Sequence, residues 1–458
     1  MATKRIMEKI GKVWEADPND RKSSNKVLSD LFESKIAGYV KERIAKEIIN
    51  RDEQKEMSAR ILEIDIVKRI VTKLAKAYKE IPVRKVVGGS EKDNEILDWY
   101  LKNTNLKDIF FSVDKNYNNF KESLIQCFYH IKTNKPYFKA WSPMDYIAVS
   151  DDIQDTTNAT IFATYYGQTE SKQVLLFCVS EHEAWIQDLK GDLYPNETNP
   201  MNENIYGSNP FIYIKNTKAD VMPYPDDSMI SVATLIPMLC GDINYAIKYM
   251  SYGIVYGINI KEDLIRRGPN AFWNLLPFDE AAGIPPTVGT LKPDIDIKDV
   301  FDGIMMQLQL WLNARGISSS IFGYNTSSIS SGVSKMIDEA DVTDIIKSNQ
   351  VTYAEMEKNL FDFVMYHGHE VWKLNNPDIP QQSFTPGCYV ETIFQEPDVI
   401  KTRQELLTEI KAEIESGLMS KKMAAKKLYP NMSDDEIDSL LLEIKEESRQ
   451  SQQTEESQ

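Results

Sequence analysis

Residues that could bind a metal or move a proton are few in this chain. It has four histidines, and two of them, His367 and His369, flank Gly368. A spacing of two residues places these side chains on different faces of a helix. We therefore expect a structural or helix-end role for both and no metal site. His130 and His182 lie in ordinary amphipathic stretches, and we expect structural roles for them too.

Adjacent acidic residues could supply carboxylates for metal-assisted hydrolysis, but a two-metal site needs carboxylates that converge from separate elements. Helix capping and solvation explain adjacent pairs better. The sequence holds no GxxxxGK[ST], GxSxG or HExxH motif, and its glycine-rich spots are not in a phosphate-cradling context. We therefore predict that the protein is not an enzyme and needs no metal or cofactor. The acidic pairs are Asp151–Asp152, Asp226–Asp227 and Asp434–Asp435.

The charge balance limits how the chain could use nucleic acid. It carries 69 acidic and 53 basic residues, a formal net charge of −16 over 458 residues. Proteins that clamp phosphates are usually basic on the binding face. Tight phosphate clamping is therefore not expected. The hydrophobic share of 42% is ample for packed cores.

The cysteines and apolar runs predict an intracellular chain. No two of the four cysteines form a CxxC pair, which favours buried, reduced thiols. The N-terminal stretch has no apolar core of signal length. No uncharged apolar run approaches the roughly 20 residues of a membrane span, so we expect no membrane partner. The cysteines are Cys127, Cys178, Cys240 and Cys388.

The first half of the chain predicts helices followed by strands. Apolar residues recur at helical spacing before Pro82, and two further helical stretches are expected at 94–101 and 105–132. From 136 to about 216, short β-branched and aromatic runs alternate with polar turns. This order predicts an α+β fold that is mainly helical. The apolar helical positions are Val27, Leu31, Ile36, Val40, Ile44 and Ile48, then Ile66, Ile70, Leu74 and Ala77.

The second half predicts long helices around a small β insert. Residues 226–253 are apolar almost all round, so this helix must be covered on several sides, and Pro237 should kink it or mark its start. Three strands are expected within 254–297, a helix at 298–315, and a serine-rich loop up to Gly332. A helix from Val333 to about Leu374 would span roughly 60 Å. A separate helical unit occupies 396–447, interrupted at Gly417.

Three sequence segments, in this order, resemble segments of the portal proteins of tailed bacteriophages. The first resembles the turn-rich segment that leads into the strand before the family's first stem helix. The second resembles the entry into its long helix, and the third resembles its C-terminal helices. The resemblance covers roughly residues 25–447. The segments are NPMNENIYGSNPFIYIKN, GISSSIFGYNTSSISSGVSKM and EPDVIKTRQELLTEIKAEIESGLMSKKMAAKKLYPNMSDDEIDSLLLEIKEE.

The resemblance implies the portal fold, with wing, stem, clip and crown and a long kinked helix across the wing. The wing would comprise residues 1–225, the stem helices 226–253 and 298–315, and the clip 254–297. The tunnel loop region would be 316–332, the long helix with the end of the wing 333–395, and the crown 396–447. The polar tail, 448–458, is expected to be disordered.

A portal protein forms a ring, dodecameric in the family, at one vertex of the capsid. The resemblance implies a virion location after assembly in the host cytoplasm, and a channel through which double-stranded DNA is packaged and ejected. The implied partners are further copies of the chain, the terminase large subunit, a head-completion adaptor, and the major capsid and scaffolding proteins. The absence of a Walker motif suits a conduit whose motor is a separate ATPase.

Three sets of residues would carry this function. Short hydroxyl side chains in the tunnel loop can donate to phosphates without trapping the DNA. Lys248 and Lys335 are candidates for brief channel contacts, and a charged loop of the clip would contact partners. The tunnel loop residues are Tyr324, Asn325, Thr326, Ser327, Ser328, Ile329, Ser330, Ser331 and Gly332, and the clip residues are Lys261, Glu262, Asp263, Arg266 and Arg267.

Alternatives remain for each part. The loop could be a plain connector, the clip loop a solvated turn, and the lysines ordinary surface residues. The first stem helix could be a core helix of a monomer; in a ring, Met229, Ile236, Leu239, Ile243 and Ile247 would contact neighbouring subunits, and Met305 and Met306 would adapt to them. For the whole chain, the alternatives are a cytoplasmic helical scaffold without a channel and a divergent nucleic-acid enzyme.

Overall fold

The computed structural model describes most of the chain and divides it into two compact units. Unit 1 comprises Met1–Asn325 and Ala340–Gln395, and unit 2 comprises Thr326–Glu339 and Glu396–Gln458. The fold is α+β and mainly helical, as the sequence predicts. The described residues are 20–166, 173–178, 183–186, 204–252, 254–259, 283, 285–291, 296–318, 332–395, 403–429 and 436–444.

The N-terminal helices form where apolar residues recur at helical spacing. Val40 and Ile44 of α3, and Ile66, Ile70 and Leu74 of α5, are buried as predicted. Helix α6 begins at a capping box in which Ser90 and Asp93 satisfy each other's backbone N–H groups. These helices are α2 (Asp20–Phe32), α3 (Ala37–Glu47), α4 (Arg51–Ser58), α5 (Ile66–Leu74), α6 (Glu91–Asn103) and α7 (Leu106–Phe120).

The predicted helix at 105–132 is wrong in its second half. Helix α7 ends at Phe120 because Lys121 adopts a left-handed conformation, with φ of 65°. The chain then enters strand β2 (Glu122–His130), which pairs with β3 (Lys135–Trp141) and β8 (Phe211–Lys215). A second antiparallel sheet has the order β4 (Tyr146–Val149), β5 (Ile161–Tyr166), β6 (Gln173–Cys178) and β7 (Glu183–Ile186).

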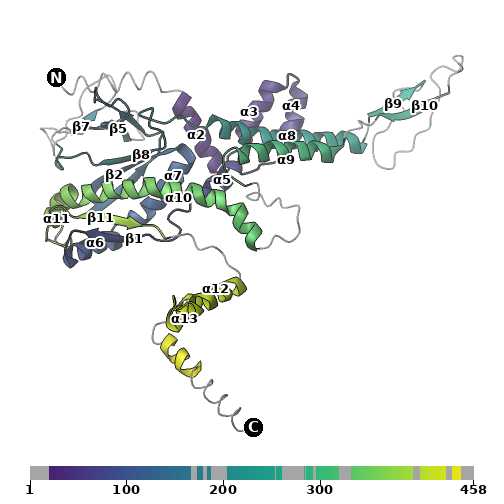
Figure 1. The fold of residues 1–458 in the computed structure, drawn as a ribbon. Coiled ribbons are helices and arrows are strands. Elements are labelled where there is room, and N and C mark those ends of the chain that lie inside the picture. Colours follow the sequence, from purple (N-terminus) through teal and green to yellow (C-terminus); the bar gives the residue numbers. More distant parts are fainter. Residues whose placement is uncertain are drawn as a thin grey trace, which may run out of the picture. The chain divides into compact units, whose positions relative to one another are not determined.

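A two-stranded sheet joins distant parts of unit 1. Strand β1 (Val83–Val87) pairs with β11 (Tyr389–Ile393), so that Val83 lies opposite Ile393. The sequence predicted neither strand. Figure 1 shows this sheet and α6 on one side of the long helix α10, with α7 crossing nearby.

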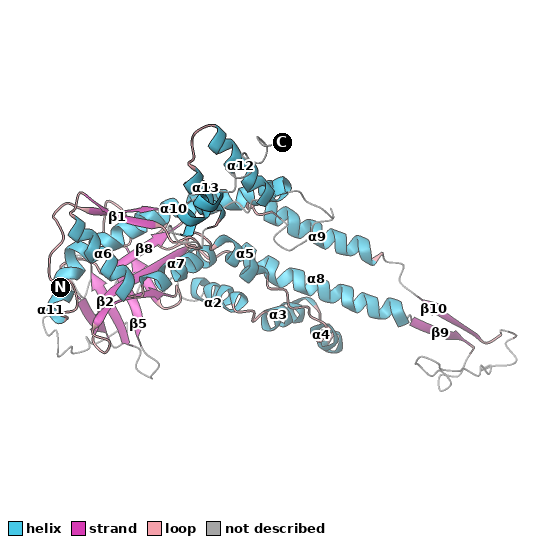
Figure 2. Cartoon of the chain, turned by 90° about the horizontal axis from the view of Figure 1, so that it is seen from below, coloured by secondary structure: helices cyan, strands magenta, loops and turns pink. Residues whose placement is uncertain are grey.

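Helix α8 (Asp227–Tyr252) and helix α9 (Ile297–Asn313) run side by side away from the sheets and are joined through a β ladder (Figures 1 and 2). Strands β9 (Ile254–Ile258) and β10 (Thr287–Leu291) pair antiparallel at the end of the helical pair. These are two of the three predicted strands, and the third lies outside the described residues. Pro237 is inside α8, so the prediction that it marks the start of the helix is wrong.

Helix α8 is apolar enough over Asp227–Ile247 to cross a membrane by length and composition alone. The sequence prediction considered uncharged runs only, and this stretch contains Asp242. In unit 1, α8 packs against α2, α3, α4, α5 and α9. Its apolar character is therefore used, at least in part, for packing within the chain.

The predicted long helix is present as three consecutive segments. Helix α10 (Gly332–Phe363) continues through a π-helical turn (Val364–Gly368) into α11 (His369–Asn375). A π-helical turn is a common cause of a kink in a long helix. A side chain at Gly368 would place its Cβ 2.6 Å from the Trp372 ring, so only glycine lets this ring pack against the turn.

Unit 2 has helices on either side of a glycine break. Helix α12 (Arg403–Glu415) ends just before Gly417, whose φ is 74°, as the sequence predicts. Helix α13 (Lys421–Leu428) is capped by Ser420, whose hydroxyl accepts a hydrogen bond from the Met423 N–H at 3.2 Å. Residues 436–444 are also helical.

Candidate functional site

Most of the predicted site residues lie outside the described part of the chain. This applies to tunnel-loop residues 324–331 and to the clip loop from Lys261 to Arg267. Gly332 is the first residue of α10, and Lys335 lies in the same helix. Lys248 lies in α8. The side chains of both lysines are outside the described residues, so their channel role stays a prediction.

The α8–α9 pair flanks both predicted loops in the sequence. The clip-loop residues fall between β9 and β10 in chain order, and the serine-rich segment follows α9. Figure 2 shows the two helices side by side over their described length. The pair is therefore the described element on which the candidate site depends.

A partly buried ion pair joins Asp226, at the start of α8, to Arg315, two residues after the end of α9. Arg315 donates two hydrogen bonds to Asp226, each 2.6 Å long, and its guanidinium lies 4.4 Å from the centre of the Trp311 ring. Asp226 also caps α8 by accepting from the Met229 N–H. Burial alone would raise the pKa of Asp226, but hydrogen bonding and charge from Arg315 hold it well below its ordinary value.

This ion pair fixes where the chain leaves α9. Gly316 follows Arg315 directly and has a φ of 66°, which a residue with a side chain rarely adopts. The capping role that the sequence assigned to Asp226 is confirmed. Its bond to Arg315, 89 residues away, was not predicted.

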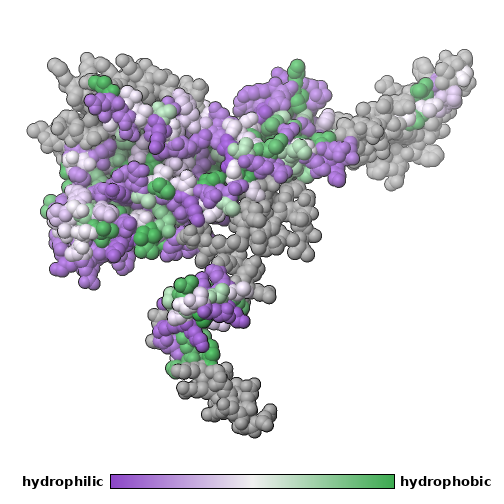
Figure 3. All heavy atoms as spheres, viewed as in Figure 1, coloured by the Kyte–Doolittle hydropathy of each residue, from purple (hydrophilic) through white to green (hydrophobic). Residues whose placement is uncertain are grey.

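One face of α9 carries apolar residues that nothing covers within the described part of the chain. Val300, Met306 and Leu310 are 43%, 63% and 63% exposed. Gly303 lies between them, and a Cβ built there meets no atom within 4 Å. Figure 3 shows apolar residues exposed along the described part of the pair. The sequence singled out Met305 and Met306, and the structure exposes Met306 while Met305 packs against the core.

The predicted contact residues on α8 need correction. Met229 and Ile236 are each only 3% exposed, because the helices around α8 already cover them. Neither can contact a neighbouring subunit. Leu239 and Ile243 are partly buried against the same core, and only Ile247, at 40%, is strongly exposed. The core-helix interpretation therefore holds for much of α8.

His369 has the structural role that the sequence predicts. It is fully buried, with Nε2 2.8 Å from the Gln382 carbonyl and Nδ1 2.9 Å from the Tyr100 hydroxyl. Because a carbonyl only accepts, Nε2 carries the proton and Tyr100 donates to Nδ1. Burial lowers the pKa of His369, which favours this neutral form. Among the described residues, no three His, Cys, Asp or Glu side chains form a metal-binding group.

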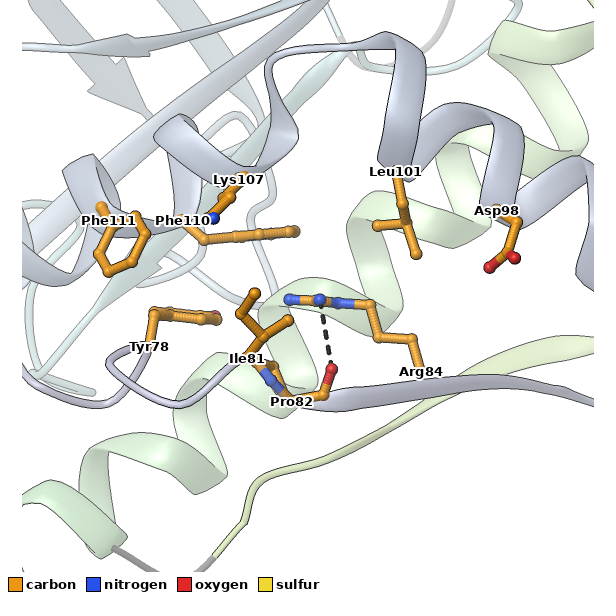
Figure 4. Close-up of a pocket in the computed structure, with 9 residues that line it drawn as sticks. All are labelled: Tyr78, Ile81, Pro82, Arg84, Asp98, Leu101, Lys107, Phe110 and Phe111. Atoms are coloured by element: carbon orange, nitrogen blue, oxygen red, sulfur yellow. Dashed lines mark hydrogen bonds between the residues drawn. The ribbon is translucent and has the colours of Figure 1, made fainter. Parts of the chain in front are cut away.

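A pocket of about 260 Å³ lies between β1 and the helices α6 and α7 (Figure 4). Its wall includes Arg84, whose guanidinium lies 4.6 Å from the Phe110 ring centre and donates two hydrogen bonds to Glu357, at 2.7 and 2.9 Å. Glu357 is fully buried and also accepts from the Thr392 hydroxyl. Arg84 is thus held in place by α10 and is not available as a free cation. The remaining lining residues are Tyr78, Ile81, Pro82, Asp98, Leu101, Lys107 and Phe111.

No family model matches this chain, and no curated protein matches it. The chain is similar to one in the solved structure described as "Neck of empty GTA particle computed with C6 symmetry", with 10% identity and a TM-score of 0.43 over 79% of this chain and 89% of that one. It is also similar to one in "Virion of native gene transfer agent (GTA) particle", with 10% identity and a TM-score of 0.40 over 83% and 93% of the two chains.

Proposed function

We propose that this chain is a portal subunit, which forms a ring at one capsid vertex of a phage-like particle. The observation that carries the proposal is the α8–β9–β10–α9 excursion, which leaves the α+β core of unit 1 as a paired stem and exposes an apolar face on α9. The order of sheets, stem, β insert, second stem helix, loop and long helix is that of the portal resemblance. In this proposal the protein is a conduit for DNA, has no enzymatic activity of its own and needs no cofactor.

The exposed face of α9 supports self-association. Val300, Met306 and Leu310 share this face with Gly303, which allows close approach of another backbone. A contact between this face and a different surface of the next copy would be heterologous, and heterologous contacts close into rings when the rotation permits. We propose a ring of about twelve copies, as the family resemblance implies.

The acidic charge supports a channel that does not hold DNA tightly. Exposed Asp302 lies on α9, exposed Asp299 shares the helix face of Gly303, Met306 and Leu310, and the chain carries a net charge of −16. A negative wall repels the duplex toward the axis, so the duplex can slide in either direction. In this proposal, the tunnel loop at 324–332 contacts the phosphates through hydroxyls, with brief contributions from Lys248 and Lys335.

The proposed partners follow from the two ends of the stem. The β9–β10 ladder would present the clip loop, with Lys261 and Arg266, to the terminase large subunit and later to a head-completion adaptor. Charged rims of this kind tune association rate and partner choice. The body of the ring would contact the major capsid and scaffolding proteins. The protein would be located at the portal vertex of the virion after assembly in the host cytoplasm.

Ring formation is the property to test first. Negative-stain imaging of the purified protein, with mass from light scattering, should show rings of about a dozen subunits with an axial hole wide enough for duplex DNA. The imaging should be repeated with scaffolding and capsid proteins present, because rings can also form only during capsid assembly.

A compact dimer that persists across concentrations, with or without those proteins, would contradict the proposal and favour a helical scaffold. Nuclease activity that depends on a divalent metal would instead favour the enzyme alternative. Neither result is compatible with a ring-shaped conduit.

A further inference from the structure

The tip of the β2–β3 hairpin carries an aromatic and basic patch that the proposed portal function does not use. Phe128 and Tyr137 lie opposite each other on the two strands, with ring centres 5.5 Å apart. The His130 ring lies 5.6 Å from the Tyr137 ring. Ile131 is 85% exposed at the turn, and Tyr137 is 39% exposed. We name these residues the hairpin patch: Phe128, His130, Ile131, Lys132, Lys135 and Tyr137.

Hydrogen bonds hold the turn beneath this patch in one conformation. The Thr133 N–H donates to His130 Nδ1 at 3.1 Å, and the Tyr129 hydroxyl donates to the Asn134 side chain at 2.7 Å. Asn134 has a φ of 53°, which asparagine tolerates well. Its carbonyl accepts from Asn376, which follows α11. The exposed side chains are therefore presented by a fixed turn, which lowers the entropy cost of binding.

The charge of this region is opposite to that of the whole chain. No acidic residue occurs between Glu122 and Asp145, whereas the chain as a whole carries −16. Lys132 and Lys135 are exposed, and neither forms an ion pair in the part of the chain that the structure describes. Lys139, further along β3, stacks on Trp141 at 3.3 Å from the ring centre. The hairpin itself is thus basic on an acidic protein, and the acidic residue next to its turn in the fold is exposed Asp378, two residues from Asn376.

The geometry favours a protein partner over a nucleic acid. Base stacking needs an open ring face, but Phe128 and His130 are partly buried and Tyr137 is only 39% exposed. Ile131, the most exposed residue of the patch, offers apolar contact and no hydrogen bond. Aromatic residues beside an apolar anchor are typical of the centres of protein interfaces.

We propose that the hairpin patch is a docking site for an acidic amphipathic segment of another protein. The apolar side of that segment would pack on Ile131 and Tyr137, and its carboxylates would face Lys132 and Lys135. Opposite charges would speed association and select against basic partners. The inference does not depend on ring formation, because every residue of the patch belongs to one hairpin.

The test uses the full chain and a fluorescent synthetic helix of 14 residues composed of Glu, Leu and Ala, measured by fluorescence anisotropy. A peptide with Lys in place of Glu, a 14-base-pair DNA duplex and a 14-nucleotide single strand serve as competing probes. We expect saturable binding of the acidic peptide alone. The K132E/K135E variant should weaken it at least tenfold, and I131D at least fivefold.

The matched control is K92E/K115E, which reverses two exposed lysines on α6 and α7, away from the hairpin. It should bind the acidic peptide within twofold of the wild type. Equal melting temperatures for all variants would exclude misfolding. No saturable binding, equal losses in the control, or tighter binding of either DNA than of the acidic peptide would each overturn the proposal.

Discussion

Asp114 is a buried carboxyl whose surroundings predict a measurable effect of pH on stability. It is 1% exposed and accepts hydrogen bonds from the Ala77 N–H, the Tyr353 hydroxyl and the Asn118 amide, at 2.8–2.9 Å. Burial raises its pKa to about 6, although these hydrogen bonds oppose the rise. The folded protein therefore binds this proton more tightly than the unfolded chain does, and stability from this group is lost as the pH rises from about 4 to about 6.

The D114N variant should lack this dependence. Urea unfolding of both proteins at pH 4 to 7 should show the wild type losing up to about 3 kcal/mol, relative to the variant, across that window. D93N is a control of opposite sign. Hydrogen bonds from Thr385 and Ser90 lower the pKa of Asp93 despite its burial, so its stabilising effect is lost as the pH falls below about 4. Parallel pH profiles for wild type and D114N would contradict the prediction.

The Arg84–Glu357 pair predicts a large cost for removing one partner alone. Their side chains are 6% and 0% exposed, so either single variant leaves an uncompensated buried charge. We expect R84M to lower the free energy of unfolding by about 3–5 kcal/mol. The R84M/E357L double variant should cost less than R84M, which chemical denaturation of the four proteins in the cycle would measure. Additive losses would show that the two residues do not act as a pair.

At this scale, the sequence predicts local chemistry better than distant pairing. The structural role of His369, the cap at Asp226 and the buried thiols of Cys127, Cys240 and Cys388 follow from near neighbours and burial tendency, and the structure confirms them. The pair Arg21–Glu122 joins residues 101 apart, and Arg84–Glu357 joins residues 273 apart. A periodicity in one sequence carries no information about such partners. Their discovery required the fold.

Elements show the same limit. Helices α8 and α9, and the long helix formed by α10, the π-helical turn and α11, begin and end within a few residues of the predicted bounds. The sequence predicts a helix where β2 lies, because Leu124, Ile125 and Phe128 also recur at helical spacing. Strands β1 and β11 are five residues each and gain stability only from pairing across more than 300 residues. A local sequence pattern cannot predict strand pairing between residues so far apart in the chain.

The π-helical turn in the long helix predicts a specific packing effect at Gly368. A Cβ there would lie 2.6 Å from the Trp372 ring, which is fully buried. G368A should therefore destabilise the protein by about 1–3 kcal/mol through overpacking. In the W372L background, the same substitution should cost less, because the smaller side chain leaves room. Thermal unfolding of the four proteins would measure the coupling, and equal costs in both backgrounds would rule out this contact as the cause.

For the whole molecule, composition predicts an acidic chain with packed cores, the order of its patterns predicts a mainly helical α+β fold, and the described fold agrees. What composition cannot give is which apolar residues remain uncovered after the chain has folded. The sequence predicts that helix α8 is covered on several sides, and five other helices of the chain do pack against it. Helix α9 carries the exposed face instead. The site of self-association is thus a property of the fold, since it is the surface that remains when internal packing is complete.

Because the exposed residues of α9 do not contribute to the core of the subunit, they can be changed to test assembly without disturbing the subunit. Met306 and Leu310 are each 63% exposed on α9, so M306E/L310E should leave the melting temperature of the isolated subunit within about 2 °C. In preparations where the wild type forms rings, the variant should remain monomeric by light scattering, because it places two charges in a contact that must lose water.

The matched control, I153E/L374E, changes two residues that are 85% and 82% exposed elsewhere in unit 1, and it should still form rings. Rings of normal size from M306E/L310E would mean that the copies meet through another surface. The exposed face of α9 would then need a different partner, whereas loss of rings in both variants would point to a general effect of added charge on this already acidic chain.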